Sequence, residues 1–180
     1  HGVTAFLFAC TKGQVECVDI LIEAGCDAAA TRDNGRTGLM LAARGGHAAA
    51  VQALIAGGAE LEAKDANGIT AFLIACATGH VECMEMLIEA GCDVKVQLHN
   101  GKTAMDIAKK SDNEAAVLLL RDVERTQQLE GLKRLARDHI AAARWPEARA
   151  ALDKALKAAP DDLGLLQLTT ELRHAMEQAD

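Results

Sequence analysis

One segment of the chain decides the fold: NGITAFLIACATGHVECMEMLIEAG, residues 67–91. Its Asn-Gly pair predicts a turn with positive φ. Thr70 stands where the N-cap residue of a helix accepts a hydrogen bond from a first-turn amide. An apolar helix is expected over residues 71–76 and should end at Gly79. A second helix is expected from about His80, and Gly91 stands just past its end, where a left-handed residue is favoured. The segment therefore predicts a turn, a helix, a turn and a second helix.

The same pattern recurs along the chain every 33 residues. A threonine follows the first glycine of each unit by two positions, at Thr4, Thr37, Thr70 and Thr103. Ten of the fifteen glycines lie on this repeat, in three series: Gly2, Gly35, Gly68, Gly101; Gly13, Gly46, Gly79; Gly25, Gly58, Gly91. A helix pair of this size cannot bury its own apolar face, so successive units are expected to stack.

The repeat length, the glycine positions, the capping threonine and the Gly-His step resemble the ankyrin repeat. The resemblance covers four repeats, 1–31 (N-terminally incomplete), 32–64, 65–97 and 98–125 (terminal). It implies an all-α solenoid with hairpin-like turns. Every repeat lacks the proline and histidine that the family carries after the threonine, so apolar packing is expected to replace them. The first repeat lacks its leading turn, and we expect it to expose Phe6 and Phe8.

The last fifty residues depart from this repeat. Pro146 is expected to open a helix, and a helical hairpin over 129–162 with a capping helix over 163–180 is predicted. Trp145, Ala148, Leu152 and Pro160 stand where a tetratricopeptide repeat has its signature residues, so the hairpin resembles that family. The capping segment also resembles, more loosely, the helical segment ahead of the Tudor domain in a survival-motor-neuron-related splicing factor, through residues 163–168 and 171–172. Apolar faces are expected at Leu132, Leu135, Ala136, His139 and Ile140, and at Leu163, Leu166, Leu168, Leu172 and Met176.

The composition excludes several classes of function. The 180 residues carry a net charge of −7, no tyrosine, three phenylalanines and one tryptophan. Few aromatic rings are available to stack on bases, and the charge has the wrong sign for a general phosphate binder, so no nucleic-acid partner is expected. No apolar stretch approaches the ~20 residues that span a bilayer, so no membrane insertion is expected. We expect a soluble intracellular protein, cytoplasmic or nuclear, or inside an organelle if a targeting peptide was removed.

The residues that usually carry chemistry fit the repeat better than they fit a catalytic or metal site. Three cysteines of the first repeat recur 66 residues later, and alanine stands at the equivalent positions of the second repeat, so all six are expected to be reduced core thiols. These cysteines are Cys10, Cys17, Cys26, Cys76, Cys83 and Cys92. His47 and His80 are expected to bond backbone at the start of a second helix. Asp106 is not interpreted as a general base. No catalytic residue, metal site or cofactor is predicted, and the protein is not expected to be an enzyme.

The charges divide into two surfaces. Acidic residues spaced three and four apart on the second helices predict an acidic convex stripe: Glu16, Asp19 and Glu23, and Glu82, Glu85 and Glu89. The ankyrin resemblance implies that partners bind the opposite, concave face. The partner-binding residues that it implies are Lys12, Asn34, Arg36, Arg44, Lys64, Asn67, Ile69, Thr78, His99, Asn100, Lys102 and Lys110. The wider set also includes Thr11, Asp33, Gln97 and Ser111. Six of these sixteen are Lys or Arg and one is acidic, which indicates either ordinary solvated turns or a basic groove.

The hypothesis that follows is a non-catalytic protein–protein interaction module, an adaptor or scaffold that binds an acidic partner segment on the basic concave face. The alternative is a structural subunit or spacer that docks through its ends. A remote alternative is part of a multidomain enzyme or RNA-processing protein. Because the sequence begins with His1 and the first repeat is incomplete, we also expect a fragment of a larger protein or a component of a larger complex.

Overall fold

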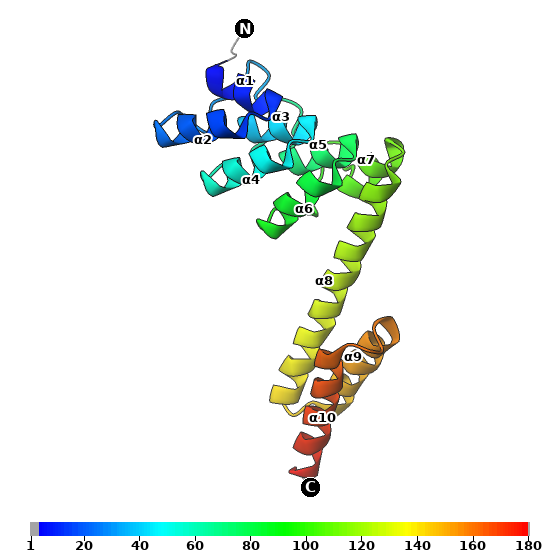
Figure 1. The fold of residues 1–180 in the computed structure, drawn as a ribbon. Helices are drawn as coiled ribbons and strands as arrows, with labels where there is room; N and C mark the ends of the chain where they lie inside the picture. The colour runs from blue at the N-terminus through cyan, green and yellow to red at the C-terminus, as the bar shows by residue number, and fades with distance from the viewer. Residues whose placement is uncertain (1–3, 180) are drawn as a thin grey trace. The chain divides into compact units, whose positions relative to one another are not determined.

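A computed structural model describes residues 4–179, and within that range the chain forms ten α-helices and no β-strand (Figure 1). The expected all-α class is therefore confirmed, while His1 and Gly2 lie outside the described residues. The chain divides into two compact units, His1–Leu120 and Arg121–Asp180. The helices are α1 (Ala5–Lys12), α2 (Val15–Glu23), α3 (Gly38–Gly45), α4 (Ala48–Ala56), α5 (Ala71–Thr78), α6 (Val81–Glu89), α7 (Ala104–Lys110), α8 (Glu114–Ala141), α9 (Trp145–Ala158) and α10 (Leu163–Glu177).

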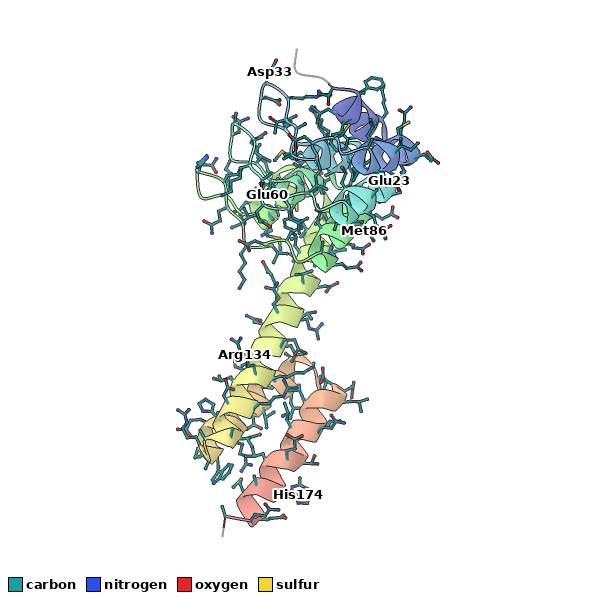
Figure 2. All side chains as sticks on the ribbon, turned by 90° about the vertical axis from the view of Figure 1, so that its left-hand side faces the viewer. Glu23, Asp33, Glu60, Met86, Arg134 and His174 are labelled. Atoms are coloured by element: carbon teal, nitrogen blue, oxygen red, sulfur yellow. The ribbon has the colours of Figure 1, made fainter. Side chains whose placement is uncertain are left out.

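The first unit is a stack of helix pairs in two layers. α1, α3, α5 and α7 pack side by side, and α2, α4 and α6 pack against one another in a second row (Figure 1). Isolated β-bridges join Thr31 to Thr37 and Gln97 to Thr103, which makes the connecting turns hairpin-like. The side chains of Glu23 and Met86 project from the second row (Figure 2). All six acidic residues of the predicted convex stripe are exposed on α2 and α6.

The capping threonines behave as the sequence predicts. Each hydroxyl oxygen accepts a hydrogen bond from the amide three residues on, at 3.2 Å for Thr4, 3.3 Å for Thr37, 3.4 Å for Thr70 and 3.2 Å for Thr103. Gly13, which ends α1, has a φ of 65°. In the last repeat Asp112 replaces the corresponding glycine and adopts the same left-handed region, with a φ of 56°. The local signals therefore set the helix boundaries in all four repeats.

Burial at one repeat position shows how each repeat covers the next. Ala50, Cys83 and Ala116 are fully buried, whereas the equivalent Cys17 is exposed on α2. The position is covered only where the structure describes a preceding repeat. Cys26 is exposed as well, so the prediction of six core thiols is correct for four cysteines and wrong for these two.

The two phenylalanines of α1 separate by the same rule. Phe8 is 51% exposed, as predicted, but Phe6 is only 3% exposed. The ring of Phe6 lies against Gly38 at the start of α3, so the second repeat covers it. The expectation that Phe6 would be exposed is therefore wrong.

The second unit packs the later turns of α8 against α9 and α10. Its buried core is apolar: Ala136, Ala148, Ala151, Leu152, Ala155, Leu165, Leu168 and Leu172. Pro146 stands in the first turn of α9, as predicted. Leu135, Leu163, Leu166 and Met176 are exposed rather than buried, which corrects the two predicted apolar faces. Asp162 caps α10 by accepting from the Leu165 amide at 3.0 Å, and the face that turns inward carries Leu165, Leu168 and Leu172 instead.

The predicted boundaries at residues 125 and 129 both fall inside α8. Residues 114–130 contain neither proline nor glycine, so nothing in the sequence ends the last repeat's second helix there. The first turns of α8 contribute Ala116 and Leu120 to the core of the first unit. The tetratricopeptide-like character of the hairpin over 129–162 and the assignment of 163–180 as a capping helix stay predictions.

Candidate functional site

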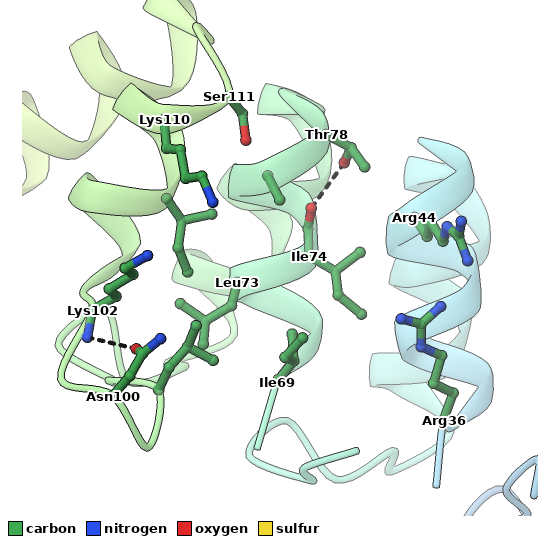
Figure 3. Close-up of a pocket in the computed structure, with 13 residues that line it drawn as sticks. Arg36, Arg44, Ile69, Leu73, Ile74, Thr78, Asn100, Lys102, Lys110 and Ser111 are labelled. Carbon is green, nitrogen blue, oxygen red and sulfur yellow. Dashed lines mark hydrogen bonds between the residues drawn. The ribbon is translucent and has the colours of Figure 1, made fainter. Parts of the chain in front are cut away.

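A groove of about 520 Å³ opens on the face formed by α3, α5 and α7 and by the turns that precede them. Figure 3 shows Arg36 and Arg44 on one side of the groove and Lys102 and Lys110 on the other. The repeat explains this placement. Arg36 and Lys102 stand just before the capping threonines of α3 and α7, and Arg44 and Lys110 lie in the last turns of the same helices. Four cations from the second and fourth repeats therefore border one groove.

The floor of the groove is apolar and comes mainly from the third repeat. Leu73 and Ile74 of α5 lie buried at its base. Partly exposed side chains complete the floor: Ile69, Ala77, Leu98 and Ile107. Only Ile69 of these six residues belongs to the predicted contact set. The others were missed because apolar residues on a short helix are expected in the core, and the sequence alone does not separate core from groove floor.

The cations of the groove differ in how they are paired. Arg36 donates from Nε to Oδ2 of Asp65 at 3.3 Å, and the Asp65 side chain is almost fully buried. Oδ1 of Asp65 also accepts from the amides of Asn67 (2.8 Å) and Ile69 (3.1 Å), so this carboxylate holds the turn before α5. Within the described residues, the charged groups of Arg44, Lys102 and Lys110 form no ion pair. None of the described residues that line the groove is acidic.

The structure brings seven of the twelve predicted contact residues together in this groove. They are Arg36, Arg44, Ile69, Thr78, Asn100, Lys102 and Lys110, and Ser111 of the wider set joins them. The turn asparagines hold backbone: Oδ1 of Asn100 accepts from the Lys102 amide at 3.2 Å.

The remaining five predicted contact residues lie elsewhere. Lys64 lines a separate cavity of about 360 Å³ together with Glu60 and Glu62. The Lys12 ammonium lies 5.9 Å from the centre of the Phe8 ring. Asn34, Asn67 and His99 belong to the turns and do not line the groove.

The two histidines of the Gly-His step connect repeats rather than cap their own helices. The His47 ring donates from Nε2 to the carbonyl oxygen of Thr11 in the preceding repeat, at 3.1 Å. Neither His47 nor His80 makes a side-chain capping bond at the start of its own helix, which corrects that prediction. Asn113 takes the same role in the last repeat, donating to the carbonyl oxygens of Cys76 (3.3 Å) and Ala77 (2.9 Å).

The cysteines are poor candidates for nucleophiles. Burial raises the pKa of the Cys10 and Cys83 thiols to about 11 and that of Cys76 and Cys92 to about 12. These thiols stay protonated near neutral pH, and the thiolate is the reactive form. Among the described residues, no three His, Cys, Asp or Glu side chains form a group that could hold a metal ion.

Asp106 has a structural role. It accepts from the amide of Thr103 at 3.0 Å and from its hydroxyl at 2.8 Å, and the two residues form a capping box at the start of α7. These hydrogen bonds lower the pKa of the Asp106 carboxyl. Its function is therefore to cap the helix.

No helix in the described part of the chain is both long enough and apolar enough to cross a bilayer. No curated protein matches the sequence. The family model for ankyrin repeats (three copies) matches residues 1–65 and 39–128. The two matches together span more than half of the chain and include every residue of the groove. The chain therefore belongs to the ankyrin repeat family, whose repeats are typically non-catalytic and generally mediate protein–protein interaction.

Proposed function

We propose that this protein is an adaptor or scaffold that binds an acidic segment of a partner protein in the basic groove between Arg36, Arg44, Lys102 and Lys110. The observation that carries the proposal is the set of three cations without an ion pair around a floor that contains no acidic residue. Like charges that face one groove repel one another, and a ligand that carries carboxylates relieves this repulsion. Complementary charge also steers encounter and sets register.

The charge of the first unit makes the groove distinctive. Residues 1–120 contain nine Lys or Arg and fifteen Asp or Glu, a net charge of −6. Four of the nine cations border the groove. An acidic partner is therefore repelled by most of the surface of this unit and attracted at one place, which favours a single bound orientation.

The test compares two charge-reversed variants of the full chain in affinity capture followed by a binding measurement with the captured partner. Arg44→Glu, Lys102→Glu and Lys110→Glu together should weaken binding about tenfold or more, because each attraction becomes a repulsion. The matched control reverses Lys95, Lys154 and Lys157, which are exposed outside the groove. Arg36 is left unchanged because its reversal would break the Asp65 contact. Equal affinity for the groove variant and the control would contradict the proposal.

A second candidate function is a structural subunit that docks through its ends. The exposed apolar side chains of the first repeat support it: Phe8 is 51% exposed and Ile20 is 63% exposed. Under this alternative, Phe8→Ser with Ile20→Ser removes the interaction, and reversal of the groove charges leaves it intact. The same capture experiment therefore separates the two functions.

We also propose that the protein works in a reducing intracellular compartment, as part of a larger assembly. The support is that all six cysteines are free, with Cys17 and Cys26 at the surface. Exposed thiols persist more readily where the glutathione pool keeps them reduced.

A further inference from the structure

The groove alternates in character from repeat to repeat. Two rows of equivalent positions, each 33 residues apart, cross it: Arg36, Ile69 and Lys102 in the turns, and Arg44, Ala77 and Lys110 in the last turns of the helices. Both rows have a cation in the second repeat, an apolar residue in the third and a cation in the fourth. The two rows lie at opposite ends of the first-row helices, so the alternation extends across the groove.

From this alternation we infer that the groove binds an extended peptide segment in which an apolar side chain stands between two acidic groups. The inference rests on the proposed function and specifies the partner's chemistry. The apolar side chain would lie on Ile69, Leu73 and Ile74, and the acidic groups would meet the cations on both sides.

The spacing between repeats sets the length of the segment. Packed helices lie about 8–10 Å apart, so the two cationic sides, two repeats apart, are separated by roughly 16–20 Å. An extended chain advances about 3.3 Å per residue. The acidic groups should therefore stand about five or six residues apart, with the apolar residue midway.

The apolar centre is as important as the charge. The Arg36 guanidinium already shares the Asp65 carboxylate, so the charge available to a ligand comes mainly from Arg44, Lys102 and Lys110. Exposed charge pairs stabilise a complex by only about 0.2–1 kcal/mol each, whereas burial of a leucine side chain contributes more. A purely acidic segment should therefore bind weakly, and the apolar residue should determine which acidic segment binds.

The test uses three labelled peptides of seven residues and measures their affinity for the full chain by fluorescence anisotropy. The first has two glutamates at each end, a central leucine and a serine on either side of it. In the second, serine replaces the leucine. The third has the composition of the first but carries its leucine at one end. The first peptide should bind at least about tenfold more tightly than the other two.

Two variants assign this preference to the groove. Arg44→Glu with Lys110→Glu should abolish binding of all three peptides, while the control Lys154→Glu with Lys157→Glu should leave it unchanged. Ile69→Lys should retain binding but lose the preference for leucine. The substitution is compatible with the fold because arginine and lysine occupy the equivalent positions 36 and 102. A circular-dichroism melt of each variant verifies that it is folded.

The other outcomes each overturn the inference in a distinguishable way. If all three peptides bind equally and the groove variant loses them all, the central apolar contact is wrong and the proposed acidic partner stands. If tripolyphosphate binds as tightly as the leucine peptide, the groove is a general anion site, and no apolar group is recognised. If no peptide binds the wild-type chain, or if the groove variant binds them as well, both the inference and the proposed function fail.

Discussion

Gly13 shows at the scale of a single residue how a repeat is tied to its neighbour. Its φ of 65° disfavours any side chain, and a Cβ built there would lie 2.5 Å from the His47 ring. Gly13→Ala should therefore destabilise the first unit twice over. The left-handed conformation costs about 1–2 kcal/mol, and displacement of His47 from the Thr11 carbonyl costs about 1 kcal/mol more. The free energy of unfolding from urea titration measures the sum.

Gly25 is the matched control for this prediction. Its φ is 78°, but no heavy atom lies within 4 Å of a Cβ built there. Gly25→Ala should thus cost only the conformational part. In a His47→Ala background, the cost of Gly13→Ala should fall to the level of Gly25→Ala. If the two alanine variants cost the same in the wild-type background, His47 does not connect the repeats as described.

At the scale of the helix, the stacking of the second row predicts opposite effects of one substitution at equivalent positions. Cys83 is fully buried on α6, whereas Cys17 is exposed on α2. Cys83→Leu should overpack this contact and cost about 1–3 kcal/mol. Cys17→Leu should change stability by less than about 0.5 kcal/mol, as surface substitutions usually do. Equal losses in the two variants would show that burial at this position does not depend on the preceding repeat.

The sequence predicts the elements well and their neighbours poorly. The threonine caps and the left-handed glycines act within four residues, so their pattern is visible in the chain itself. Phe6 and Phe8 differ by two residues on one helix, and only the position of Gly38, thirty residues away, explains why one is buried. Leu163 and Leu165 exchange roles for a similar reason, because the inward face of α10 depends on the packing of α8 and α9.

The candidate site follows the same division. The cations of the groove could be predicted because the repeat assigns them to one face. The apolar floor could not, since Leu73 and Ile107 have the same apolar pattern as core residues. Nor does the sequence show that Asp65 binds Arg36 across 29 residues. That contact depends on how two neighbouring turns meet.

At the scale of the whole molecule, the two units should respond differently to acid. In the second unit the Lys133 ammonium lies 2.9 Å from Oε1 of Glu130 and 2.9 Å from Oδ2 of Asp162. The hydrogen bond from Lys133 lowers the pKa of the Asp162 carboxyl, and the two carboxylates raise the pKa of Lys133. Two charged side chains thereby join α8 to the start of α10.

The signs of the two shifts define the pH range of this contact. Asp162 has a lowered pKa, so its contribution is present above the ordinary aspartate value of about 4 and is lost as the pH falls through the lowered value. Lys133 has a raised pKa, so its contribution is present below the ordinary lysine value of about 10.4 and is lost as the pH rises through the raised value. The contact should therefore stabilise the second unit fully from about pH 5 to pH 9.

Trp145, the only tryptophan in the chain, makes this prediction measurable because it packs against the core of the second unit. A thermal melt followed by tryptophan fluorescence reports that unit, and a melt followed by circular dichroism reports both. The fluorescence midpoint should fall between pH 5 and pH 3, and Lys133→Met should lower the midpoint at pH 7 and flatten its dependence on acid. Lys154→Met, at an exposed position of α9, is the control and should keep the wild-type dependence. An unchanged acid response in Lys133→Met would show that the pairing with Asp162 does not stabilise this unit.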